Sequence, residues 1–135
     1  MQRFFAIRSL AAALITILSI ATLPAALADI ADYEFRLVES DLTQGDGATV
    51  AVQLVDTRSG KPVPDAVIFA TRLDMAPEGM ATMTAPVEAL PSTEPGVYRF
   101  RTNLMMAGGW QLSLAAKVQG EVGTLQNQLI LRALP

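Results

Sequence analysis

Residues 49–55 read T-V-A-V-Q-L-V, and this stretch decides the fold class. Its large apolar residues, Val50, Val52 and Leu54, are each separated by one small or polar residue. Successive side chains of a β-strand point to opposite faces of the sheet, so a period of two predicts a strand with one buried face. The same alternation recurs at residues 97–101, 109–118 and 124–132. No amphipathic stretch of ten residues after Asp29 shows the helical period instead.

Turn residues separate these stretches. Glycine, proline and polar residues cluster at positions 44–47, 59–62, 94–96, 108–109 and 119–121, as is typical of tight connections between strands. Seven short strands within about 100 residues are typical of an immunoglobulin-like β-sandwich, so we predict an all-β domain of that class. We expect strands at residues 33–39, 48–55, 66–73, 84–90, 97–102, 109–118 and 124–132, with a loop at 75–83.

Tyr98 occupies a position that is typical of a tyrosine corner. It follows the turn at residues 94–96, at the start of an expected strand. A tyrosine in this position can hydrogen-bond through its hydroxyl to backbone upstream in the chain. We therefore predict a structural role for Tyr98 and no catalytic one.

The first 28 residues have the layout of a secretory signal peptide. Arg3 and Arg8 precede an uncharged stretch at residues 10–23, and the small-residue run A-L-A follows at 26–28. We predict cleavage after Ala28, which leaves one periplasmic or secreted domain, residues 29–135. The alternative is a retained anchor in the inner membrane over residues 10–27, since a membrane-spanning helix needs about 20 residues.

The composition excludes several chemistries. The 135 residues include no Cys and no His, which rules out disulfides, thiolate nucleophiles, histidine-centred triads and conventional zinc or haem sites. The leader holds two of the ten basic residues and none of the thirteen acidic ones, so residues 29–135 have a net charge of -5. Such a domain has no basic surface for nucleic acid. The carboxylates show neither calcium-loop spacing nor an apolar pocket for acid-base catalysis, so we expect no enzyme.

Methionine is the conspicuous residue type of the mature chain. Three methionines lie within nine residues around a Pro/Gly loop, and two more precede Gly108. Thioether sulfur is a soft, neutral ligand that suits Cu(I), and its binding requires no loss of a proton. A Cu(I) site would require the two segments to converge at one end of the sandwich. The predicted ligands are Met75, Met80 and Met83 with Met105 or Met106, and the indole face of Trp110 would cover the ion.

The same residues also have a purely structural interpretation. Methionine commonly fills gaps under loops, and Trp110 would then be the core tryptophan of the sandwich. Asp74 and Glu78 flank the loop, where they either tune a cation site or are simply solvated, and we favour solvation. Spacing alone leaves both the copper and the structural interpretation open.

Four motifs, in order, resemble the YtkA-like (FixH-like) domain family. They are T-R-S-G-K-P-V-P-D-A at 57–66, the methionine-rich segment at 74–83, E-P-G-V-Y at 94–98 and M-A-G-G-W at 106–110. The resemblance runs from about Asp41 to the end of the chain. It implies an extracytoplasmic immunoglobulin-like domain, of a kind found alone, behind a membrane anchor or attached to efflux adaptor proteins for heavy metals. The FixH branch is associated with copper-pump and cytochrome oxidase maturation systems.

The resemblance also bears on the methionines. Its methionine positions correspond to Met75, Met80, Met83 and Met106, whereas Met105 lies outside the pattern. It implies Cu(I) as ligand and a membrane copper pump, efflux protein or oxidase-assembly protein as partner. Periplasmic copper sites often include histidine, and the absence of histidine here predicts a weak or transient site. The competing hypothesis is a metal-free interaction module that presents an exposed sheet edge or its methionine-rich loops to a membrane partner.

Overall fold

The computed structural model describes residues 29–135, so the expected signal peptide or anchor lies outside the described residues. Within that range the chain forms nine strands and two short 3-10 helices, and none of its helices is long and apolar enough to span a membrane. In chain order the elements are η1 (Ile30–Asp32), β1 (Tyr33–Leu37), β2 (Asp41–Thr43), β3 (Gly45–Asp56), β4 (Val67–Met75), η2 (Ala76–Glu78), β5 (Met80–Ala85), β6 (Val87–Leu90), β7 (Val97–Leu104), β8 (Gly108–Lys117) and β9 (Leu125–Leu134).

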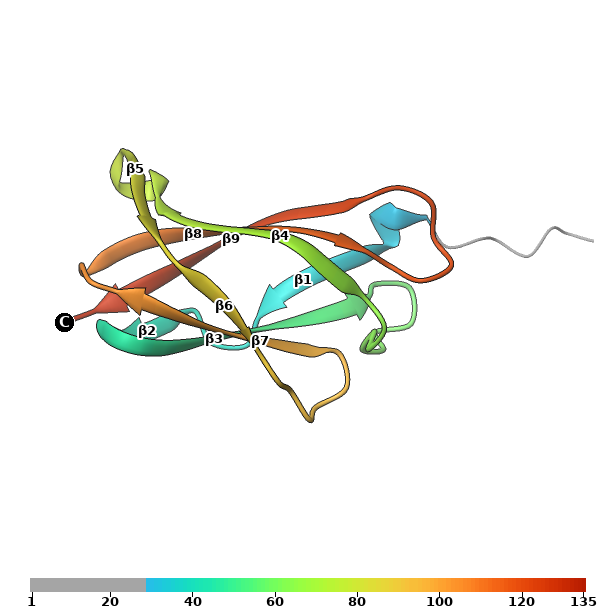
Figure 1. The fold of residues 1–135 in the computed structure, drawn as a ribbon. Helices are drawn as coiled ribbons and strands as arrows, with labels where there is room; N and C mark the ends of the chain where they lie inside the picture. Colours follow the sequence, from blue (N-terminus) through green and yellow to red (C-terminus); the bar gives the residue numbers. More distant parts are fainter. Residues whose placement is uncertain (1–28) are drawn as a thin grey trace, which may run out of the picture.

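The strands form two stacked sheets (Figure 1). One sheet has the order β1-β3-β7-β6 and the other has the order β2-β9-β8-β4-β5. When the short strands β2 and β5 are set aside, the seven remaining strands can be lettered A to G along the chain. The sheets then read A-B-E-D and G-F-C, which is the arrangement of an immunoglobulin sandwich. The predicted class, an all-β immunoglobulin-like sandwich, is confirmed.

The expected strands and loops differ from the structure in three places. The three residues of β2 pair in parallel with the end of β9, and so short a strand shows no readable period. The stretch at 84–90, expected as one strand, contains the end of β5 and the whole of β6. Pro86 separates the two, and β5 and β6 belong to different sheets. The expected loop at 75–83 is in fact a hairpin formed by the end of β4, η2 and most of β5.

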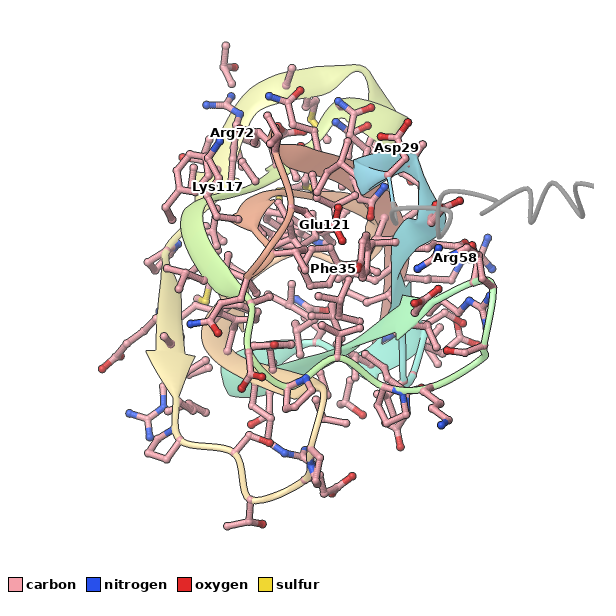
Figure 2. All side chains as sticks on the ribbon, turned by 90° about the vertical axis from the view of Figure 1, so that its right-hand side faces the viewer. Asp29, Phe35, Arg58, Arg72, Lys117 and Glu121 are labelled. Atoms are coloured by element: carbon pink, nitrogen blue, oxygen red, sulfur yellow. The ribbon has the colours of Figure 1, made fainter. Side chains whose placement is uncertain are left out.

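The core lies between the sheets, and Figure 2 shows Phe35 there among side chains of both layers. The period of two in the sequence corresponds to burial, because alternate residues of the long strands face inward. On β8 the inward residues are Trp110, Leu112, Leu114 and Ala116, and on β3 they are Val50, Val52 and Leu54.

Tyr98 ties β7 to the segment that precedes β4. Its hydroxyl donates a hydrogen bond to the carbonyl of Val63 at 2.8 Å and accepts one from the backbone N–H of Ala66 at 3.1 Å. The ring also makes an edge contact with Phe35, with the ring centres 6.1 Å apart. Burial raises the pKa of the Tyr98 phenol. The predicted structural role of Tyr98 is confirmed.

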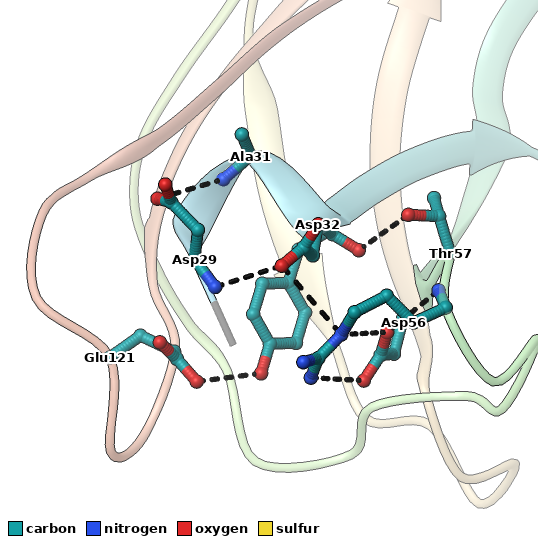
Figure 3. Close-up of polar contacts among 8 residues, drawn as sticks. Asp29, Ala31, Asp32, Asp56, Thr57 and Glu121 are labelled. Atoms are coloured by element: carbon teal, nitrogen blue, oxygen red, sulfur yellow. Dashed lines mark hydrogen bonds and ion pairs between the residues drawn. The ribbon is translucent and has the colours of Figure 1, made fainter. Parts of the chain in front are cut away.

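A polar network secures the start of β1 (Figure 3). Asp29 and Asp32 form a capping box around η1, and Arg58 reaches the carboxylates of Asp32 at 3.6 Å and Asp56 at 3.3 Å. The hydrogen bond from Arg58 lowers the pKa of the Asp56 carboxyl. The Tyr33 hydroxyl donates to Glu121 at 2.9 Å. The beginning of the domain is thereby joined to the loops before β4 and before β9.

Candidate functional site

The two methionine-bearing segments of the chain meet at one end of the sandwich. The first is the hairpin formed by the end of β4, η2 and β5, and the second is the turn between β7 and β8. The carboxylate Oε1 of Glu78, in η2, accepts a hydrogen bond from the backbone N–H of Gly109 at 2.8 Å. We call this region, residues 75–83 together with residues 105–110, the methionine end.

The contact depends on small residues in the turn. A Cβ atom built on Gly109 would lie 3.0 Å from the Cβ of Pro77, and one built on Gly108 would lie 3.1 Å from the Glu78 carboxylate. Gly108 also has a φ of 133°, in the region that favours glycine. The glycine pair therefore lets the turn pack directly against η2, and this is a structural reason for the G-G-W sequence.

Asp74 shapes the hairpin from inside. Its carboxylate accepts a hydrogen bond from the backbone N–H of Ala76 at 2.9 Å and forms an ion pair with Arg72 at 2.8 Å. The Ala76 hydrogen bond and then the Arg72 guanidinium hold the pKa of this carboxyl below its usual range. Asp74 is only 3% exposed, so the expectation that it is solvated was wrong. Glu78 is exposed, but its contact with Gly109 gives it a structural partner as well.

Met75 and Met80 lie opposite each other in the hairpin, where β4 pairs with β5. Met75 has no solvent exposure and is part of the hydrophobic core. Its terminal methyl lies 3.3 Å from the position that a Cβ on Gly108 would occupy. Met80 is half-buried against the core, and Met83, farther along β5, is 41% exposed.

The β7–β8 turn carries the other two methionines, and their backbone carbonyls have different partners. The carbonyl of Met105 accepts a hydrogen bond from the Gln44 side chain at 2.8 Å, which ties it to the chain between β2 and β3. The carbonyl of Met106 accepts one from the indole N–H of Trp110 at 3.1 Å. Both methionine side chains are exposed, whereas Trp110 is 2% exposed. Trp110 is therefore a core residue, and its indole face is not available to cover an ion at the surface.

The structure thus divides the six predicted site residues into two groups. Met75 and Trp110 are buried under the methionine end, and Met80, Met83, Met105 and Met106 reach the surface of hairpin and turn. Within residues 29–135, no three His, Cys, Asp or Glu side chains are placed to hold a metal ion. Thioether sulfurs are accordingly the most numerous potential metal ligands at this end of the domain.

Sequence reasoning missed the contact between Glu78 and Gly109. The two residues are 31 positions apart, and each taken alone resembles ordinary turn chemistry. Only the packing of one connection against the other reveals that they are partners.

Comparison with known proteins gives a family match, and the similar solved structures include the two described here. The model of the YtkA-like family matches residues 27–115. No curated protein gives a match. A crystal structure of the Lin-41 filamin domain is 17% identical with a TM-score of 0.46, and the match covers 80% of this chain and 95% of that chain. The C-terminal domain of ZirS is 15% identical with a TM-score of 0.45, and the match covers 100% of this chain and 80% of that chain.

Proposed function

The chain belongs to the YtkA-like family, and from that premise we propose that it is an extracytoplasmic, non-enzymatic accessory domain that binds Cu(I) at its methionine end. The family and the immunoglobulin-like sandwich support an accessory or interaction domain. The observation that carries the copper assignment is the Glu78–Gly109 hydrogen bond, because it holds both methionine-bearing segments at one end.

The chemistry of the donors favours Cu(I) over other metals. A site without histidine, cysteine or grouped carboxylates offers nothing to zinc, calcium or magnesium, whereas neutral thioethers suit a soft monovalent ion. Methionine also stays a competent ligand in an oxidising compartment, because it forms no disulfide. The exposed or half-buried thioethers of Met80, Met83 and Met106 are the proposed ligands.

Met75 has a different position from the other predicted ligands. Its side chain is fully buried in the core, so a copper ion arriving from solvent would reach it only if the packing around it opened. We assign Met75 a packing role beneath the site. Trp110 has the same kind of role, since its indole N–H is bonded to the Met106 carbonyl and thereby shapes the turn.

The proposed physiological role is transfer of copper. A shell made of thioethers at a surface, without histidine, binds Cu(I) weakly enough to pass the ion to another protein. The recipient would be a membrane copper pump, an efflux protein or an oxidase-assembly protein, reached in the periplasm. The net charge of -5 on residues 29–135 is of the sign that attracts a cation.

A Cu(I) titration of residues 29–135 against a competing chelator tests this proposal. The triple variant Met80→Leu/Met83→Leu/Met106→Leu removes the proposed sulfurs while keeping the apolar volume, because leucine and methionine are similar in size. We expect it to bind Cu(I) at least about tenfold more weakly, a loss of about 1.4 kcal/mol. Met105→Leu is the matched control, since Met105 lies outside the methionine positions that the family resemblance implies, and it should bind like the parent. Equal, negligible uptake by parent and triple variant would remove the copper assignment.

A further inference from the structure

Strand β4 is paired along only part of one side. Its pairing with β8 extends from Val67 to Asp74, but its pairing with β5 covers only Leu73 to Met75. Figure 1 shows the reason: β5 lies beside one end of β4, and the chain then leaves for the other sheet as β6. Among the described residues, positions 67–72 of β4 therefore have no strand neighbour on that side.

A groove lies next to this free edge. It has a volume of about 530 Å³ and lies between β4 on one side and β6 and β7 on the other. Apolar side chains from both sheets line it, namely Ala66, Val67, Ala89, Leu90, Val97 and Phe100. We call it the β4–β6 groove.

The free edge is unusually apolar. Val67 is 61% exposed and Phe69 is 56% exposed. The register between β4 and β8 shifts between Ile68 and Ala70, so Phe69 has no residue opposite it on β8. Exposed edges are normally guarded by proline or by charged residues such as lysine, and on the free edge at 67–72 only the last residue, Arg72, is of this kind. An edge of this kind is a template for another strand.

One polar group in the groove lacks a partner. The hydroxyl of Ser92 is buried and has no hydrogen-bond partner within the described part of the chain, and Ser92 lines the groove. A buried hydroxyl without a partner is unfavourable, and the N–H or C=O of an incoming peptide group would satisfy it. This observation points to an occupant with a polar backbone as well as apolar side chains.

The charges around the groove indicate which side chains the occupant carries. Arg99 and Glu94 line the groove but form an ion pair with each other at 2.7 Å, so they leave no net charge. Asp65 lies between two lining residues in the sequence, but its own place is in the neighbouring hollow, which shares Pro64 with the groove; it is exposed and has no ion-pair partner among residues 29–135. Apolar side chains thus suit the middle of the groove, and a basic side chain suits the position next to Asp65.

We propose that the β4–β6 groove receives an extended segment of a partner protein, which adds to β4 as an extra strand. Its backbone pairs with positions 67–72, its alternate apolar side chains cover Val67 and Phe69, and a lysine or arginine of the segment pairs with Asp65. A second copy of this chain is the weaker candidate, because two copies related by a two-fold axis would present the same concave groove to each other.

This site is separate from the methionine end. The free edge belongs to the first part of β4, whereas the methionine end begins at its last residue, Met75. The proposal therefore does not depend on copper, and a failed copper titration leaves it intact.

A selection from a display library of random 12-residue peptides against residues 29–135 tests the proposal. We expect the recovered peptides to alternate apolar and polar residues and to carry a lysine or arginine near one end. A synthetic copy of the most enriched peptide, added to the ¹⁵N-labelled domain, should shift the backbone amide resonances of positions 67–72 and of the lining residues. This measurement uses the unmodified domain, so it does not depend on the folding of any variant.

Substitutions in the domain then identify which residues contribute to peptide binding. Val67→Lys/Phe69→Lys should weaken peptide binding at least tenfold, and Asp65→Lys should weaken it several-fold. Ile130→Lys is the matched control, because Ile130 is 54% exposed on the same sheet but lies on β9 opposite Gln111 of β8, away from the groove. Recovery of no binder, shifts confined to other residues, or unchanged affinity in the double variant would overturn the proposal. Self-association of the free domain that shifts the same amides would overturn it in favour of a second copy.

Discussion

Tyr98 makes contacts that a phenylalanine could not reproduce. Its hydroxyl both donates and accepts, and the Ala66 N–H that it serves lies at the entry to β4, where the chain crosses from one sheet to the other. The sequence indicated this role from the turn before Tyr98. It did not show which backbone groups are bound, because both belong to a segment more than thirty positions upstream.

We predict that Tyr98→Phe lowers the free energy of unfolding by about 1–3 kcal/mol, since it removes two hydrogen bonds and leaves a partly buried N–H without a partner. Urea unfolding of residues 29–135 measures this effect. Tyr33→Phe is the control, because the Tyr33 hydroxyl meets only the Glu121 carboxylate. An equal effect of the two substitutions would show that the Tyr98 hydroxyl has no special role.

The Asp74 carboxylate makes the free energy of unfolding depend on pH. Its pKa lies below the ordinary value of 3.8 in the folded domain, first because of the Ala76 hydrogen bond and then because of Arg72. The ionised form therefore stabilises the folded state, with its full effect above pH about 4, and this contribution is lost as pH falls through the lower folded pKa.

We predict that Asp74→Asn is destabilising at pH 7 and that this difference shrinks at pH 3. Urea unfolding at the two pH values, for the parent and the variant, gives the comparison. The parent should lose more stability than the variant on acidification. Asp56, whose pKa is lowered by Arg58, makes the same contribution to the pH dependence of the parent and of the variant, so its effect cancels when the two are compared. If the parent and the variant lose the same free energy of unfolding between pH 7 and pH 3, Asp74 is not a source of the acid sensitivity.

At the scale of elements, the sequence predicted the long strands well and the short ones poorly. β3 and β8 carry enough alternating residues to reveal their inward face, whereas β2 has three residues and pairs only through its position beside β9. The period of two continues from Leu73 to Met75, and this signal could have placed Met75 in the core. The Pro/Gly sequence that follows suggested a loop, and the loop prediction ended the strand two residues too early.

The contact between η2 and β8 determines the position of the hairpin. We predict that Glu78→Ala releases it, because the Gly109 N–H loses its acceptor. Amide hydrogen exchange at Gly109 should become faster, and the free energy of unfolding should fall by about 0.5–1.5 kcal/mol. Glu78→Gln keeps a side-chain oxygen that can accept the bond and should behave nearly like the parent. Unchanged exchange at Gly109 in Glu78→Ala would contradict this account of the hairpin.

For the whole molecule, the fold was predictable because four alternating stretches, separated by regularly spaced turn signals, leave few alternatives to a sandwich. The candidate site was predictable only in outline. Two methionine-bearing connections do meet at one end, but which sulfurs face solvent depends on how each strand packs there. Met75 and Trp110 are buried in the core, whereas Met83, Met105 and Met106 are exposed and Met80 is half-buried.

We propose above that thioethers of the methionine end coordinate Cu(I). The ¹H–¹³C signals of the methionine methyl groups report on this coordination while Cu(I) is added to residues 29–135 under anaerobic conditions. We expect the methyl signals of Met80, Met83 and Met106 to shift together and to reach saturation at one equivalent, while that of Met105 stays in place. If none of these methyl signals moves on addition of Cu(I), the methionine end is not a copper site.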